Sequence, residues 1–434
     1  METGFDAGRT VRVSSFNGID IYRVNTDKFK TSSIHFFFQD NLTRESVTKN
    51  ALLPAVMRRG SVSYPTQRDI SKELESLYGA SFDCGVTKKG ERHIIHFYTE
   101  FLSKQYVPDG TDTFAAALSL LFDIIARPAL VNGRFSEEYL VQEKDNLKIK
   151  IEGRVNDKMN YSVDRCMEEM CRNEPFEIYD YGFAEDLAGI TADELTMHYR
   201  TVLETFPVQV YLVGSITDEE AEKVSELLSG LARGSTITLR NGFARKEKAD
   251  VRHVTEEMNV TQGKLCLGCR TNTAPDSDDY PALMVYNGIL GGGIHSKLFR
   301  NVREKASLAY YCYSMLEKFK GLMVISSGID IGNKQKALDI MEEQLDDMAR
   351  GNISDYEMEA AVKSMETGIK SLTDSQMNIV DFYLSQTIAG TRDDFSTIME
   401  KIRKVTKDDV KAAAQRIVRD TVYFLTAADS AGNQ

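Results

Sequence analysis

The sequence has neither an excess of basic residues nor a high cysteine content, and each absence argues against a class of protein. Its 53 Lys and Arg residues face 65 Asp and Glu residues, which gives a formal net charge of −12. Non-specific binding to nucleic acid depends on a basic surface, so this balance argues against a nucleic-acid partner. Six cysteines in 434 residues are too few for a disulfide framework. Reduced thiols in a cytosolic compartment are the better interpretation.

Long apolar segments are also missing. The longest, residues 114–126, is interrupted by Ser119 and Asp123 and is too short to span a bilayer. The first residues show no basic patch followed by an apolar run, which is the pattern of a signal peptide. We therefore expect a cytoplasmic protein without a membrane partner.

What is present describes a globular protein of more than one unit. A single core stops growing at roughly 250–300 residues, so 434 residues predict at least two units. Capping-box patterns mark helix starts at 191–194, 217–220 and 354–357, with a weaker version at 406–409. Long stretches of helical periodicity cover about 136–172 and 354–388. Together these features predict long helices among shorter strands.

Short strands are predicted in both halves of the chain, and the elements recur in the same order. The strand patterns are SSIHFFFQ and HIIHFYTEF in the first half, and KLCLGCR, SLAYYCYSM and GLMVISSGI in the second. ALLPAVMRRGSV at residue 51 matches ALMVYNGILGGG at 282, and three further pairs follow in order. We predict an α+β fold of two homologous domains, each a mostly antiparallel sheet packed by long helices. The expected domains are residues 1–233 and 253–434, joined by a polar linker at 234–252.

Two pairs of possible metal ligands do not form a recognisable site. His93 and His96 stand in an alternating, strand-like segment, so their side chains are expected on opposite faces. Cys266 and Cys269 also stand in an apparent strand, and no second pair completes a zinc ribbon. We expect two packed or exposed histidines and two buried thiols. The remaining four histidines are not clustered in the sequence.

The segment GGGIHSKLFRNVREKASLAYY, residues 291–311, allows two interpretations. Gly291, Gly292 and Gly293 fit neither a Walker loop nor a dinucleotide fingerprint. They predict either a tight turn that uses positive φ or a flexible rim that contacts an extended peptide. The following helix is expected to bury Ile294, Leu298, Phe299 and Val302 and to turn Arg303 away from that core. Periodicity alone favours an ordinary solvated arginine, but Arg303 and Tyr310 could both point at a bound carbonyl.

The longer segment DYPALMVYNGILGGGIHSKLFRNVREKASLAYYCYS resembles the C-terminal half of insulinase/pitrilysin-type zinc peptidases. Their signature runs approximately L-G-G-G-x-S-S-R-L-F-x-x-x-R-E-x-x-x-L-A-Y, and His295 and Lys297 depart from it. The resemblance extends over nearly the whole chain, since that family is also a tandem of two similar α+β domains. It places the family's substrate-binding arginine and tyrosine on Arg303 and Tyr310.

The resemblance also shows where zinc would be expected. In the family, an inverted H-x-x-E-H helix supplies two histidine ligands and a general-base glutamate, and a later glutamate completes the ligands. The corresponding stretch here is ALLPAVMRRGS, which puts Ala51 and Ala55 at the histidines and Pro54 at the base. When Glu143 is aligned with the first downstream glutamate, Lys150 falls on the last ligand. None of these four side chains can perform the family's role, because alanine and proline have no donor atom and a protonated lysine repels Zn²⁺.

The resemblance therefore implies a non-catalytic subunit of a heterodimeric zinc peptidase, as in two-subunit bacterial pairs and the mitochondrial processing peptidase. The chain itself would carry no cofactor. A homologous partner with H-x-x-E-H would hold the zinc, and Arg303 and Tyr310 would bind the substrate peptide. Two alternatives stay open. One is a catalytically inert scaffold or peptide-binding protein, and the other is an independent metalloenzyme with other ligands.

Overall fold

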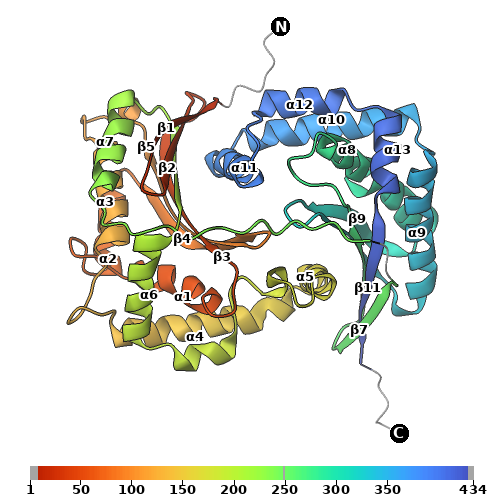
Figure 1. The fold of residues 1–434 in the computed structure, drawn as a ribbon, viewed down its shortest axis with the longest axis horizontal. Helices are drawn as coiled ribbons and strands as arrows, with labels where there is room; N and C mark the ends of the chain where they lie inside the picture. The colour runs from red at the N-terminus through yellow and green to blue at the C-terminus, as the bar shows by residue number, and fades with distance from the viewer. Residues whose placement is uncertain (1–7, 248–249, 429–434) are drawn as a thin grey trace. The chain divides into compact units, whose positions relative to one another are not determined.

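The structure is a computed structural model that describes residues 8–247 and 250–428. The chain forms two compact units, and each combines segments from distant parts of the sequence (Figure 1). The first unit contains Met1–Gly153, Ile178–Asn241 and Thr373–Thr387, and the second contains Arg154–Glu177, Gly242–Leu372 and Ile388–Gln434. The expected domain boundaries, at residues 233 and 253, are single divisions of the sequence, whereas each unit combines three segments. The boundaries stay a prediction.

The first unit is built on a six-stranded sheet in the order β1-β2-β6-β3-β5-β4. Its strands are β1 (Thr10–Phe16), β2 (Ile19–Asn25), β3 (Thr31–Asn41), β4 (Ser81–Lys89), β5 (Arg92–Leu102) and β6 (Val208–Gly214). Its helices are α1 (Val47–Met57), α2 (Gln67–Ser76), α3 (Thr113–Ala126), α4 (Glu137–Gly153), α6 (Ala192–Thr205), α7 (Asp218–Ser229) and most of α11 (Gln376–Ala389). Apolar residues from one face of the sheet and from α1, α3, α6 and α7 form its core.

The second unit is built on a five-stranded sheet in the order β7-β11-β8-β10-β9. Its strands are β7 (Arg252–Met258), β8 (Gly263–Arg270), β9 (Ala309–Glu317), β10 (Leu322–Ile329) and β11 (Val418–Ala427). Its helices are α5 (Lys158–Met170), α8 (Tyr280–Gly291), α9 (Lys334–Arg350), α10 (Asp355–Leu372), α12 (Phe395–Arg403) and α13 (Lys407–Gln415), with a π-helix, η5, at Phe299–Lys305.

The two sheets share one topology. The run β2-β6-β3-β5-β4 of the first corresponds to β7-β11-β8-β10-β9 of the second. In both sheets the first and last of these strands in sequence pair in parallel, and the other pairs in the run are antiparallel. The predicted α+β class with two similar, mostly antiparallel sheets is confirmed, as are the five predicted strands.

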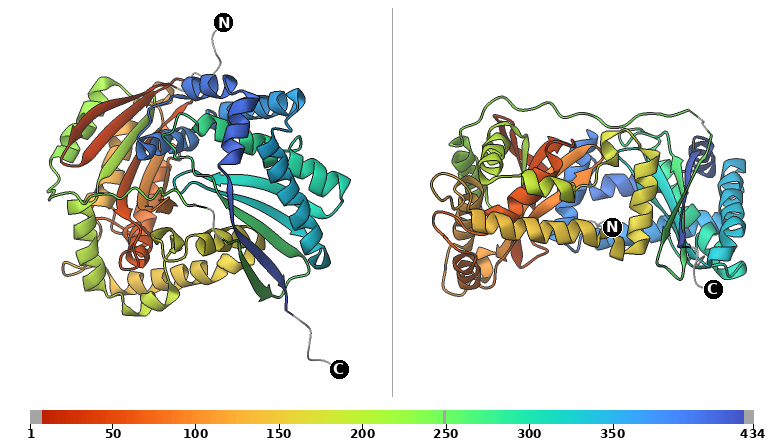
Figure 2. Two further views of the ribbon diagram at one scale, coloured as in Figure 1. Left: turned by 45° about the vertical axis from the view of Figure 1, so that its right-hand side comes forward. Right: turned by 90° about the horizontal axis from the view of Figure 1, so that it is seen from below.

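The helical stretches predicted at 136–172 and 354–388 are each interrupted. The first divides into α4 and α5, and the second divides into α10 and α11. Helix α5 packs on β8, β10 and β11 of the second unit, whereas α11 bonds to the first sheet through Gln376 and Thr387. The polar segment at 232–247 forms neither helix nor strand and appears as a green coil in Figure 2. All four predicted capping boxes are present, including the weaker one at Thr406.

Candidate functional site

Helix α1 carries the three residues that the family resemblance places at zinc-binding positions. Ala51 is buried with 6% of its surface exposed, Pro54 is buried inside the helix, and Ala55 is half-buried. The Pro54 carbonyl accepts hydrogen bonds from the Arg58 amide at 3.1 Å and from the Cys84 thiol at 3.3 Å. Methyl groups and a proline ring thus occupy these positions, and they pack as part of the core.

Helix α4 packs against α1 and carries the downstream residues. Glu143 is almost fully buried, and its carboxylate forms an ion pair with Arg59, the second residue after α1. Asn146 donates a second hydrogen bond to it at 3.2 Å. Lys150 is exposed, with its ammonium group 3.8 Å from the centre of the Tyr181 ring. The carboxylate is therefore held by an arginine, and the lysine rests on an aromatic face.

Zinc does not fit these residues. The family's chemistry needs imidazole and carboxylate donors around one point, and Ala51, Pro54, Ala55 and Lys150 offer none. Within residues 8–247 and 250–428, no group of three or more His, Cys, Asp or Glu side chains is arranged to hold a metal ion.

A buried polar network, which the spacing of its members in the sequence does not reveal, lies beside the first turns of α1. Asn50 is fully buried and donates to Asp40 at 3.0 Å and to His93 at 3.2 Å. His198 donates to the side-chain amide oxygen of Asn50 at 2.6 Å, and the Ser46 hydroxyl donates to the Asp40 carboxyl group at 2.7 Å. His198, which clusters with no other histidine in the sequence, is linked to His93 through Asn50 in the fold. His93 and His96 lie on strand β5, as expected.

Burial determines the protonation state of this network. It lowers the pKa of His93 to about 4 and the pKa of His198 to about 4, so both imidazoles are neutral near pH 7. Burial also raises the pKa of Asp40, against the opposing effect of its hydrogen bonds to Ser46 and Asn50. The network thus fixes the start of α1 through hydrogen bonds between the Asp40 carboxyl group and uncharged side chains.

The glycine segment in the second unit allows the backbone at the end of α8 to approach the backbone of β9 closely. A Cβ on Gly291 would stand 2.3 Å from the Ser314 amide nitrogen of β9, and a Cβ on Gly292 would stand 2.7 Å from Gly288. A Cβ on Gly293 would meet only the His295 ring, at 3.1 Å. None of the three adopts positive φ, so the expected positive-φ turn is wrong. Gly291 is required because α8 ends against β9.

The helix expected after the glycines is a turn followed by the π-helix η5. Ile294 lies in the turn and is 76% exposed, so its predicted burial is wrong. Leu298 and Val302 are buried as expected, and Phe299 is half-buried. Arg303 is exposed, with its guanidinium carbon 4.8 Å from the centre of the Phe299 ring. Lys297, one of the two departures from the family signature, is buried and pairs with Glu357 at 3.0 Å.

Tyr310 lies at an irregularity of the edge strand β9. Its neighbours Ala309 and Tyr311 pair with Ile329 and Gly328 of β10, and the register shifts between them. A bulge of this kind re-aims a side chain, and Tyr310 is 64% exposed while Cys312 is buried. Ser307, between Arg303 and Tyr310, has a φ of 52°, which is uncommon for a residue other than glycine. Such backbone outliers and π-helices are found frequently at functional sites.

The cysteines stay as thiols that face the interior. Cys266 and Cys269 are fully buried in β8, as expected, and burial raises the pKa of each to about 12. The Cys266 thiol points to Ser326, and Cys269, three residues further along the strand, lies on the opposite face of the sheet. Neither is a reactive or ligating thiol.

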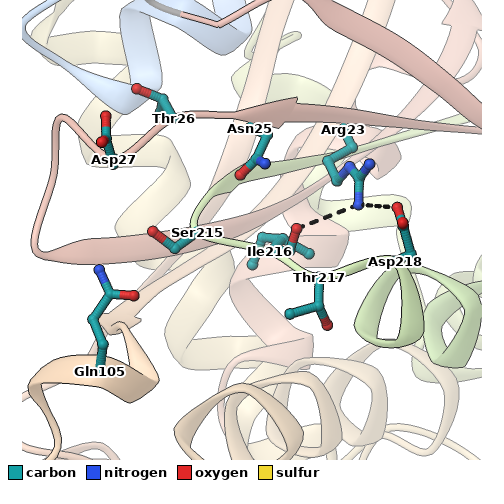
Figure 3. Close-up of a pocket in the computed structure, with 9 residues that line it drawn as sticks. All are labelled: Arg23, Asn25, Thr26, Asp27, Gln105, Ser215, Ile216, Thr217 and Asp218. Atoms are coloured by element: carbon teal, nitrogen blue, oxygen red, sulfur yellow. Dashed lines mark hydrogen bonds and ion pairs between the residues drawn. The ribbon is translucent and has the colours of Figure 1, made fainter.

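A cavity of about 690 Å³ lies in the first unit at the carboxyl ends of the parallel strands β2 and β6. Arg23, on its wall, forms an ion pair with the Asp218 carboxylate at 2.6 Å and donates a hydrogen bond to the Ile216 carbonyl at 3.3 Å. Figure 3 shows both contacts. The cationic group of this cavity is therefore already paired within the wall. None of the residues predicted for the site lines this cavity.

Comparison with known proteins identifies the class. Residues 189–365 match the family model described as the Peptidase M16 inactive domain. A relative from Bacillus subtilis, described as a probable inactive metalloprotease, YmfF, is 36% identical over 96% of this chain and 98% of its own length. The chain therefore belongs to the M16 peptidase family, and it is a protein of the inactive type within it.

Further relatives agree with this assignment. An uncharacterized zinc protease of Bacillus subtilis, YmxG, is 24% identical over 58% of this chain and 61% of its own length. The crystal structure of a conserved protein from Enterococcus faecalis V583 has a TM-score of 0.89 and 29% identity, covering 98% of this chain and all of that one. A structure of a peptidase M16 inactive domain from Pseudomonas fluorescens shares the fold with a TM-score of 0.78 and 18% identity, over 96% of this chain and 98% of that one. Within the described residues, no helix has the length and apolar character needed to cross a membrane.

Proposed function

We propose that this chain is the non-catalytic subunit of a heterodimeric zinc peptidase. A homologous partner that carries H-x-x-E-H would contribute the zinc site and its general base. This chain would contribute part of the wall around the substrate, together with Arg303 and Tyr310. The observation that carries the proposal is the contrast between α1, whose aligned positions are filled by apolar packing, and the η5–β9 segment, whose two polar groups stay exposed.

The chemistry proposed for Arg303 and Tyr310 is hydrogen-bond donation. A guanidinium group and a phenol both donate, and both suit the carbonyl oxygen of a peptide or the oxyanion that forms when water attacks it. Donors placed in advance stabilise the developing charge more than they stabilise the ground state, so they raise the rate of the chemical step.

The edge position of β9 supports the binding of an extended peptide. An edge strand presents unpaired amide and carbonyl groups, to which another strand can add. Gly291 lets the end of α8 approach β9 closely, and the exposed Gly292 lies in the turn that follows. In this proposal Gly291, Gly292 and Gly293 form a rim beside the bound peptide, and Arg303 and Tyr310 contact its carbonyl.

The direct experiment is to combine this chain with a homologous subunit that carries H-x-x-E-H and to follow both co-purification and peptide cleavage. We expect this chain alone to be inactive and the pair to cleave peptides. An inert scaffold would co-purify or bind peptide without any cleavage, and that result would overturn the proposal. A cytoplasmic location for the pair, without nucleic acid or membrane as partner, remains part of the proposal.

A further inference from the structure

A second cavity of the first unit, about 270 Å³ in volume, lies between strands β3 and β5 and the first residues of α11. Its walls include the buried side chains of Ser33, His35 and Gln376 and the half-buried Tyr98 and Glu100. Its volume lies just below the range of roughly 300–1,000 Å³ that is typical for drug-sized ligands. The cavity therefore suits one side chain or one chain end.

The hydrogen bonds around His35 fix its tautomer. The Gln376 amide nitrogen donates to the Thr31 carbonyl at 3.0 Å and to the Thr31 hydroxyl at 2.9 Å, so the amide oxygen faces Ser33. That oxygen can only accept, so the Ser33 hydroxyl donates its proton to it, at 2.6 Å. The Ser33 oxygen must then accept from His35 Nε2, at 2.9 Å. Nε2 carries the hydrogen of the neutral ring, and Nδ1 keeps a lone pair.

The Nδ1 atom of His35 lacks a partner in the described structure. The side chain is 1% exposed, and Nδ1 is a buried polar atom without a hydrogen bond. Burial lowers the pKa of His35 to about 3, so protonation cannot satisfy this atom near neutral pH. An unpaired buried acceptor is unfavourable, and a hydrogen-bond donor in the cavity would satisfy it.

The charges around the cavity select the kind of donor. Glu100 contributes a carboxylate whose Oε1 accepts the Thr31 hydroxyl at 2.6 Å. Asp374 adds a second carboxylate, paired with Lys28 at 2.6 Å. The N-terminus of α11 acts like a positive charge of about half an elementary charge, which by itself would favour an anion. The negative charge of the Glu100 carboxylate is larger, so the balance favours a cation. An anion or a neutral carbonyl would also meet the lone pair of His35 Nδ1.

We propose that this cavity binds a primary ammonium group of a peptide, from a lysine side chain or from a free N-terminus. An ammonium group carries three N–H donors and no acceptor, which matches His35 Nδ1 and the Glu100 carboxylate. The Tyr98 ring, which stacks on His35 with centroids 5.3 Å apart, offers an aromatic surface for the cation. The site belongs to this chain alone, so it does not depend on the zinc partner or on Arg303 and Tyr310.

The test uses the purified full-length chain and short peptides whose binding is followed by calorimetry and by the NMR signals of the histidine ring nitrogens. One peptide has a lysine and a blocked N-terminus, one has a free N-terminus and no lysine, and one has norleucine in place of lysine and both ends blocked. We expect at least one of the first two to bind and to shift the His35 Nδ1 signal, and the norleucine peptide to do neither. Which of the first two binds identifies the source of the ammonium group.

Two variants and a control sharpen the test. Glu100→Gln removes the charge but keeps an oxygen for Thr31, and we expect it to weaken binding about tenfold or more, as for a lost charge-assisted hydrogen bond. His35→Phe keeps the stacking on Tyr98 and removes the acceptor, and it should weaken binding in the same direction. Glu75→Gln changes the same charge at an exposed position of α2 in the same unit and should bind like the parent.

Three results would overturn the proposal: equal binding of the norleucine peptide, unchanged affinity in Glu100→Gln, or no binding of either ammonium peptide. Glu100→Gln alone suffices if His35→Phe does not fold. Because neither readout involves cleavage, the proposal can fail while the proposed peptidase role holds, and the reverse is also possible.

Discussion

Around α1, Ala51 and Pro54 are buried, and the neighbouring carboxylate of Glu143 is held by Arg59. Around β9, Arg303 and Tyr310 are exposed, next to a strand irregularity and a left-handed Ser307. The two regions therefore differ in the burial of the side chains at the aligned positions. Where the family's chemistry is absent, the side chains pack and pair as in any core. Around β9, where we propose the substrate-binding pair, the backbone has an uncommon geometry and both side chains are exposed.

This contrast predicts that substitutions in the two regions affect different measurements. Changes near α1 should lower the free energy of unfolding of this chain. Changes at Arg303 and Tyr310 should lower the cleavage rate of the assembled pair and leave the folding of this chain nearly unchanged.

The largest expected effect is on turnover. Arg303→Ala and Tyr310→Phe should each reduce cleavage by the reconstituted pair on the order of 10²–10³-fold, as for the loss of one oxyanion donor. Both side chains are exposed, so the thermal unfolding of this chain should stay close to that of the parent. Parent-like turnover in both variants would contradict the roles assigned to them, whereas loss of assembly would make their role structural.

The next effect is on stability near α1. Arg59→Ala leaves the buried Glu143 without its ion-pair partner. A fully buried pair costs about 3–5 kcal/mol to break, and the partial exposure of Arg59 lowers our expectation to about 2–3 kcal/mol in the free energy of unfolding. Lys148→Ala removes an exposed pair with Glu152 from the same helix and should cost under about 1 kcal/mol. Chemical denaturation compares them, and equal effects would show that Arg59 does not support this region.

A smaller effect separates the structural glycine from its neighbours. Gly291→Ala forces a methyl group against the Ser314 backbone and should destabilise the chain by about 1–3 kcal/mol. Gly293→Ala meets only the movable His295 ring, so its effect should stay within about 0.5 kcal/mol. Thermal unfolding of both variants decides the point. A strong loss of cleavage in a stable Gly293→Ala pair would give that glycine a direct role beside the peptide.

A further effect, spread over several pH units, is the pH dependence of the stability of the first unit. His35, His93 and His198 have pKa values lowered by burial to about 3, 4 and 4, whereas an unfolded histidine has a pKa near 6.5. Below pH 6.5 the unfolded chain binds protons that the folded chain does not, so stability falls as the pH falls towards 4. Each histidine contributes a slope of at most about 1.4 kcal/mol per pH unit.

His198→Gln removes one of these three titrating groups and keeps a hydrogen-bond donor for the Asn50 side chain. We expect the free energy of unfolding to change less steeply with pH between pH 6.5 and 5, and the decrease in slope should equal the contribution of one histidine. An unchanged slope would show that His198 is accessible to protons in the folded state.

Local patterns predicted the strands, the capping boxes and the fold class, because alternation and capping depend on neighbouring residues. They did not predict that α5 and α11 belong to sheets far away in the sequence, since a helical period is the same whichever sheet it meets. The burial of Ile294 was predicted from a period of 3.6 residues, which a turn and a π-helix do not follow. Arg303 and Tyr310 stay predicted site residues, and their exposure depends on the π-helix and the bulge, which no local pattern indicates.

The histidine network and the cavity beside His35 could not be predicted from the sequence for the same reason. Asp40, Asn50, His93 and His198 come from four different elements, β3, α1, β5 and α6, and their spacing fits no motif. The unpaired Nδ1 of His35 becomes apparent only when the bonds of Ser33 and Gln376 are known. Groups assembled from distant segments need the fold before their chemistry can be recognised.

The central claim is that this chain has replaced its own metal site by packing and supports a site on another subunit. The most direct measurement is the zinc content of the purified chain and of its co-purified pair, determined by elemental analysis. The account predicts close to one zinc per pair and none above background in the isolated chain. Stoichiometric zinc in the isolated chain would contradict it.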